Sequence, residues 1–156
     1  MNDRDILQRL VDIEEIKQLK ARYFRTVDTK DWDGYGAVFA LDAHLEVPEG
    51  QVSVDGRDAI VASVSAVLHG VVTVHHGHMP EIEITGPETA HGIWAMCDYV
   101  EFPPSEHGGR VGLQGYGHYQ EDYVREDGHW RIQRSHLSRL RIDPLAGSAP
   151  IPEVER

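Results

Sequence analysis

The chain has 156 residues, 40% of them apolar and 26% charged, and its 15 Lys and Arg against 26 Asp and Glu give a formal net charge of −11. This composition is typical of one soluble globular domain and excludes a disordered chain. The acidic balance also argues against nucleic acid or an anionic membrane as a partner, because both are bound mainly through Lys and Arg.

The single cysteine, Cys97, excludes an internal disulfide framework and any thiolate zinc cluster. No apolar run approaches the roughly 18 residues that span a bilayer. The charged first ten residues lack the apolar segment of a signal peptide. We therefore expect a cytoplasmic protein.

Helices are predicted in the first part of the chain, where apolar residues recur at spacings of three and four, the period of one helical face. In the first of them, Asp12 and Lys20 are assigned to the polar, solvent-facing side. Asp31 is a suitable start for the second. The predicted helices cover residues 5–27, 32–39 and 57–68.

Strands are predicted mainly in the second part, where β-prone and alternating stretches lie between Gly and Pro turns. They cover residues 43–47, 71–75, 81–85, 90–102, 111–125 and 130–142. Glu126-Asp127-Gly128 is a strong hairpin signal between the last two. Helices followed by hairpin-connected strands indicate an α+β fold with an antiparallel sheet. If that sheet curves around the long helix, the space between them is a natural small-molecule site.

His75, His76 and His78 lie close together at the end of a predicted strand. His76 and His78 alternate and so could reach one metal ion, but neither an H-E-x-x-H motif nor a histidine–carboxylate spacing lies nearby. A second interpretation makes all three surface or hydrogen-bonded polar residues. A third makes one of them a general base that points into the cavity.

Tyr23 and Asp28 come near the end of the first predicted helix. Tyr23 lies on the apolar face, as a core aromatic residue would. A carboxylate such as Asp28 opposes the dipole at a helix C-terminus, which favours a functional reason for it. Asp98 shares a strand face with Trp94 and Met96, so it is either a buried carboxylate that needs a partner or a solvated strand residue.

The arginines of the last predicted strand, Arg139 among them, are interpreted as sheet-face and interface residues rather than catalytic ones. Gly115 and Gly117 are interpreted as positions that permit sheet curvature. They do not form a phosphate-binding loop, because no helix follows them.

The stretches DIEEIKQLKARYFR at 12–25 and HHGHMPEIEI at 75–84, with Asp28 and Asp98, resemble SnoaL-like proteins of the nuclear transport factor 2-like superfamily. The match continues through GHY at 117–119 and into the last hairpin. The resemblance extends over about residues 5–142. Within the family it is nearest to bile acid 7α-dehydratase, and more distantly it is similar to scytalone dehydratase and hexachlorocyclohexane dehydrochlorinase.

This resemblance implies a cone, or cystatin-like α+β barrel, in which a curved, mixed, mostly antiparallel sheet wraps around a long N-terminal helix and encloses a deep apolar pocket. We expect one such domain over residues 1–142 and an arm or tail over 143–156. The resemblance further implies no cofactor and a homo-oligomer, a trimer or otherwise a dimer. We also expect no metal, because the only thiol is isolated and the histidine triplet lacks a carboxylate at ligand spacing. The catalytic positions of the family's dehydratases fall on Tyr23, Asp28, His75 and Asp98.

We therefore expect a cofactor-independent lyase, a dehydratase, acting on a bulky apolar hydroxy-carbonyl substrate such as a steroid-like or polycyclic compound. His75 would be the base, held by Asp28, although a one-residue shift in the bulge before Pro80 would put His76 in its place. Two alternatives are an isomerase or polyketide cyclase using the same pocket, and a non-catalytic small-molecule-binding protein. The expected substrate-binding residues are Trp32, Trp94, Met96 and Tyr119.

Overall fold

The computed structural model describes residues 3–104 and 110–147. Helices α1 (Asp3–Thr29), α2 (Trp32–Gly36) and α3 (Arg57–Leu68) lie in the first half, with a 3-10 turn, η1 (Pro48–Gly50). The strands are β1 (Phe39–Val47), β2 (Val52–Asp55), β3 (Val72–Gly86), β4 (Thr89–Phe102), β5 (Val111–Glu126) and β6 (His129–Pro144). Among the described residues, no helix is both long and apolar enough to cross a membrane.

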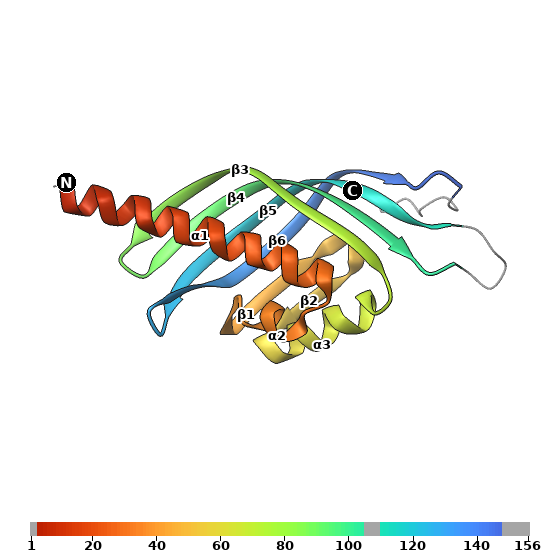
Figure 1. Cartoon of the computed structure of the whole chain (residues 1–156), viewed down its shortest axis with the longest axis horizontal. Coiled ribbons are helices and arrows are strands. Elements are labelled where there is room, and N and C mark those ends of the chain that lie inside the picture. Colours follow the sequence, from red (N-terminus) through yellow and green to blue (C-terminus); the bar gives the residue numbers. More distant parts are fainter. Residues whose placement is uncertain (1–2, 105–109, 148–156) are drawn as a thin grey trace.

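The strands form one six-stranded sheet in the order β2-β1-β6-β5-β4-β3. The β1–β6 pair is parallel, and the other neighbouring strands are antiparallel. Figure 1 shows the sheet arching over α1, with α2 and α3 gathered at one end. Asp127 and Gly128, both at positive φ, form the tight turn between β5 and β6. The predicted α+β cone, with its curved sheet and long first helix, is confirmed.

The elements differ from the prediction where local patterns were ambiguous. The two short strands predicted at 71–75 and 81–85 are one strand, β3, with a bulge between His78 and Glu81. Strand β2, only four residues long, was not predicted. The expected tail begins later than residue 143, because β6 runs to Pro144 and Leu145 is buried. The expected loop at 105–109 and the rest of the tail, 148–156, lie outside the described residues.

The core lies between the inner face of the sheet and one side of α1. From the helix, Ile16, Leu19, Tyr23 and Val27 are buried. The sheet contributes alternating residues, because successive side chains on a strand point to opposite faces. Its buried large side chains include Leu45, Trp94, Met96, Tyr119, Tyr123, Trp130, Ile132 and Leu137.

Two polar residues of α1 contradict the sequence prediction, because Asp12 and Lys20 are buried in the structure. The Lys20 ammonium donates to Glu121 of β5 at 2.6 Å, and both side chains are fully buried. Burial lowers the pKa of Lys20 to about 8, although Glu121 opposes the shift. Ser135 and Tyr123 also donate to the Glu121 carboxylate, at 2.8 and 2.6 Å. This network ties the helix to β5 and β6 at the centre of the core.

We expect Lys20→Met to destabilise the fold by about 3–5 kcal/mol, because it leaves the Glu121 carboxylate buried without its cation. The double variant Lys20→Met/Glu121→Gln should lose less unfolding free energy than the two single variants lose together, since it buries no unpaired charge. Urea unfolding measures both free energies.

Lys17→Met on the same helix is the matched control. Lys17 pairs with Glu14 at 4.0 Å on the surface, where its side chain is 46% exposed. Its loss should cost about 0.5 kcal/mol or less. Equal losses for the Lys17 and Lys20 variants would contradict the importance of the buried pair.

Candidate functional site

A histidine–aspartate pair lies where the end of α1 meets the first half of β3. Asp28 is in the last turn of the helix, and Thr73 and His75 share the inner face of the strand. The carboxylate Oδ1 of Asp28 lies 2.6 Å from His75 Nδ1 and accepts a hydrogen bond from Thr73 Oγ1 at 2.9 Å. Its other oxygen, Oδ2, accepts the backbone N–H of His75 at 2.9 Å. The aspartate therefore fixes both the ring and the backbone of His75.

These contacts also favour the charged form of Asp28. Burial alone would raise the pKa of Asp28, but the hydrogen bonds from His75 and Thr73 and the attraction of His75 outweigh it and lower that pKa. Lys30 completes the helix end, with its ammonium donating to the Val27 carbonyl at 3.1 Å and to Thr73 at 2.7 Å. The side chains of His75 and Asp28 are 10% and 21% exposed, so the pair is largely but not fully shielded from solvent.

The structure separates the two adjacent histidines. His75 points inward to Asp28, whereas His76 lies on the outer face with His78. The bulge comes after His78 and so leaves the alternation of this segment intact. Among the described residues, no hydrogen-bond partner is found for Nε2 of His75, the nitrogen opposite the aspartate.

Asp98 is the residue of β4 that pairs directly with His75 across the two strands. It is buried and forms an ion pair with Arg139 of β6, with Nη2 2.5 Å from Oδ2. Burial by itself would lower the pKa of Arg139, but Asp98 raises it. The pair needs the glycine between the strands, because a Cβ on Gly115 would lie 2.2 Å from Asp98 Oδ1 and 2.5 Å from Arg139 Nε. Gly115 thus makes room for an ion pair.

Tyr23 lies deeper, in a cluster of aromatic rings. Its ring meets those of Tyr35 and Tyr119 at centroid distances of 5.3 and 5.8 Å. The Lys20 ammonium lies 4.0 Å from the Tyr23 centroid and 3.5 Å from that of Tyr119. Burial raises the pKa of Tyr23 well above its ordinary value, so its hydroxyl keeps its proton.

The expected substrate-binding residues occupy two environments. Trp94, Met96 and Tyr119 are buried in the core, and Trp94 donates its indole N–H to Tyr123 at 2.9 Å. Trp32 is partly exposed at the start of α2, with its ring against Tyr35. Three of the four therefore contribute to the packing of the core.

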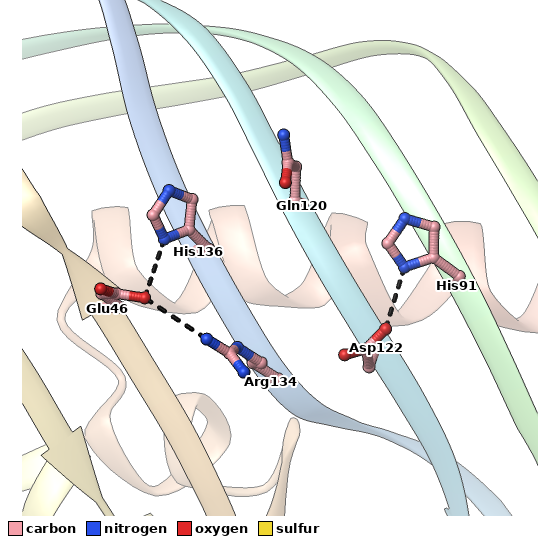
Figure 2. Close-up of a pocket in the computed structure, with 6 residues that line it drawn as sticks. All are labelled: Glu46, His91, Gln120, Asp122, Arg134 and His136. Carbon is pink, nitrogen blue, oxygen red and sulfur yellow. Dashed lines mark hydrogen bonds and ion pairs between the residues drawn. The ribbon is translucent and has the colours of Figure 1, made fainter.

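A separate hollow of about 340 Å³ lies on the face of the sheet turned away from α1 (Figure 2). Its charged side chains pair with one another. His136 lies 2.9 Å from Glu46, which is also 3.6 Å from Arg134, and His91 lies 2.9 Å from Asp122. This hollow is separated from the histidine–aspartate pair by the sheet.

Of the predicted site residues, Asp28 and His75 are in direct contact. Asp98 lies on the same face of the sheet as His75 and forms an ion pair with Arg139. Tyr23 lies in the adjoining aromatic cluster. Sequence reasoning missed the inward position of Arg139 and the burial of Lys20. Both had a signal. Lys20 lies four residues after Ile16 and three before Tyr23, and Arg139 alternates with the buried Leu137.

We expect the stabilising effect of the Asp28 carboxylate to disappear in acid. Because its pKa is lowered in the folded state, the charged form adds stability above its ordinary pKa of 3.8 and loses it as the pH falls through the folded value. The difference in unfolding free energy between the natural protein and Asp28→Asn should therefore shrink below about pH 4. Urea unfolding at stepped pH measures it, and a difference that persists in acid would contradict the lowered pKa.

Comparisons with known proteins agree on one fold. The probable cyclase FGR4 of Gibberella zeae is 25% identical over 135 residues, which cover 80% of this chain and 89% of that protein. A hexachlorocyclohexane dehydrochlorinase (LinA type 2) is 22% identical, with a TM-score of 0.79 over 94% of this chain and 97% of that one. A scytalone dehydratase-like protein of Novosphingobium aromaticivorans is 20% identical, with a TM-score of 0.77 and the same coverage.

At these identities the two solved structures establish a shared fold. The narrower similarity to bile acid 7α-dehydratase stays a prediction. The model of the SnoaL-like domain matches residues 8–136, most of the chain. With its long first helix and arched sheet, the chain belongs to the SnoaL-like domain family.

Proposed function

We propose that the protein is a cofactor-independent dehydratase that removes water from a bulky, apolar hydroxy-carbonyl compound. The observation that carries this proposal is the 2.6 Å contact between Asp28 Oδ1 and His75 Nδ1. A carboxylate at Nδ1 favours the tautomer that keeps its proton there and leaves Nε2 as a proton acceptor. The pair is therefore arranged as a general base that a substrate can reach.

In the proposed reaction, His75 Nε2 takes a proton from the carbon next to the substrate carbonyl. The electron pair of that C–H bond first forms an enolate, and its return forms the new C=C bond as the C–O bond to the hydroxyl breaks. Asp28 stabilises the imidazolium produced by the first step. The imidazolium then gives its proton to the departing hydroxide, so that water leaves and the base is regenerated.

Two further groups can stabilise the developing negative charge. Tyr23 holds its proton, because burial raises its pKa, and is a hydrogen-bond donor. The guanidinium of Arg139, held by Asp98, faces the same side of the sheet as His75. In this role Asp98 positions the arginine. A lost donor of this kind costs typically about 10²–10³-fold in turnover.

The aromatic surroundings favour an apolar substrate. Because Trp94, Met96 and Tyr119 are buried, a bulky substrate either displaces them or reacts at the partly exposed edges of Asp28 and His75. In either case the carbonyl end of the substrate must lie beside His75, since the proton acceptor is there.

A cyclase or isomerase is the second candidate, and the cyclase named among the relatives favours it. Such an enzyme would use the same base, but the enolate would attack another carbon or recover the proton at another position. A protein that holds the ligand without converting it is the third candidate.

A thermal-shift screen with steroid and polycyclic hydroxy-ketones, followed by mass analysis of the hits, separates the three. Binding to the folded state raises the melting temperature whether or not chemistry follows. We expect a product lighter than its substrate by one water. A product of unchanged mass would support the isomerase, and a ligand recovered intact after saturating binding would contradict catalysis.

On a confirmed substrate, we expect Asp28→Asn to reduce turnover by at least about 10²-fold while the fold is retained. The amide can present an N–H to the ring, which favours the wrong tautomer, and it removes the charge that stabilises the imidazolium. Adding His75→Ala to Asp28→Asn should reduce turnover little further, since the effects of substituting residues that act as a unit are not additive.

The matched control is His91→Ala, which removes another histidine bonded to an aspartate, in this case Asp122 on the outer face. Its turnover should stay close to that of the natural protein. Full activity of Asp28→Asn would refute the assigned base.

A further inference from the structure

The outer face of the sheet carries a cluster of three potential metal ligands that the proposed reaction does not use. His76 and His78 alternate on β3, and Cys97 is the residue of β4 that pairs with His76. The Cys97 Sγ lies 3.7 Å from His76 Nδ1 and 3.8 Å from His78 Nε2. All three ligand atoms lie within 4.8 Å of one another, and both histidines are exposed.

We propose that His76, His78 and Cys97 bind one divalent transition-metal ion of the zinc class. This departs from the expectation of no metal: a single cysteine cannot form a cluster of thiolates, but it can be one ligand beside two histidines. Zinc at tetrahedral angles, with Zn–S near 2.3 Å and Zn–N near 2.0–2.1 Å, separates sulfur from nitrogen by about 3.6 Å. The two observed separations, 3.7 and 3.8 Å, are close to that value. The sulfur–nitrogen spacings therefore fit a tetrahedral ion with little movement of Cys97 relative to either histidine.

The donor set selects the kind of metal. One thiolate and two imidazoles suit zinc and its neighbours in the first transition row, whereas magnesium and calcium prefer oxygen ligands. Three protein ligands leave a fourth position open to water or another small ligand. Since His76 and His78 are exposed, the ion can enter from solvent without unfolding the sheet.

The alternative is a hydrogen-bonded cysteine. The Cys97 thiol can donate to one of the two histidines while its sulfur accepts the N–H of the other, and both such bonds are weak. The two rings also meet edge to face at a centroid distance of 5.7 Å, which brings two basic nitrogens to the same sulfur. A cation satisfies all three donors together.

The site would join the edge strand to its neighbour beside the catalytic base. Strand β3 is the outermost strand on its side of the sheet, and His76 directly follows His75. The metal would lie on the opposite face from Asp28, so it takes no part in the proposed proton transfer. Its expected effect is to stabilise the strand that carries His75.

The test is a titration of metal-free protein with Co²⁺, which takes the coordination of zinc and gives a thiolate charge-transfer absorption. We expect this absorption to saturate at one Co²⁺ per chain and to disappear when Zn²⁺ is added. Zn²⁺ should also raise the melting temperature. Failure to develop the absorption at saturating Co²⁺ would overturn the proposal.

Variants decide which residues bind. Cys97→Ala should abolish the charge-transfer absorption. His78→Ala should weaken Co²⁺ binding by at least about 100-fold, because even the loss of a residue that only hydrogen-bonds to a metal ligand lowers metal affinity by about 10–100-fold. The exposed His78 can be replaced without disturbing the core. The control, His91→Ala, should bind like the natural protein. Equal Co²⁺ affinity in His78→Ala and His91→Ala would show adventitious binding elsewhere and overturn the assignment.

Discussion

The buried ammonium of Lys20 constrains the whole interior. A charge removed from water must keep its partner, and this one has Glu121 at 2.6 Å, itself held by Ser135 and Tyr123. These contacts join α1 to β5 and β6 and set both the rotation of the helix about its axis and its position along it. An apolar contact at this position would be less directional, since hydrophobic burial does not depend on orientation.

The position of the helix in turn places the candidate site. Asp28 lies eight residues, or just over two turns, beyond Lys20, and it meets β3 only if α1 has the right register against the sheet. Both oxygens of Asp28 are then used: one by the His75 ring and Thr73, the other by the His75 backbone. A carboxylate that opposes the helix dipole is stabilised here by donors from another element. The contact between Asp28 and His75 thus depends on the same packing that buries Lys20.

Much of this arrangement could be predicted from local patterns. The period of three and four located α1 and gave α3 with its observed bounds, 57–68, and the hairpin turn at Asp127-Gly128 was also visible. The pattern failed where a polar residue occupies an apolar position, as Lys20 and Arg139 do, because their partners are distant in sequence. Similarly, the two strands predicted at 71–75 and 81–85 are one strand, because β3 stays paired with β4 on both sides of its bulge. That pairing is not visible in the local pattern.

The two faces of β3 divide the chemistry of one short segment. Successive residues of a strand point to opposite sides, so the neighbours His75 and His76 belong to different surroundings. His75 faces the interior and Asp28, while His76 faces outward toward Cys97. A lone cysteine and two alternating histidines carry little information in sequence, because only the register between β3 and β4 brings them together. The same register pairs His75 with Asp98, so a slip of one residue would disrupt both faces at once.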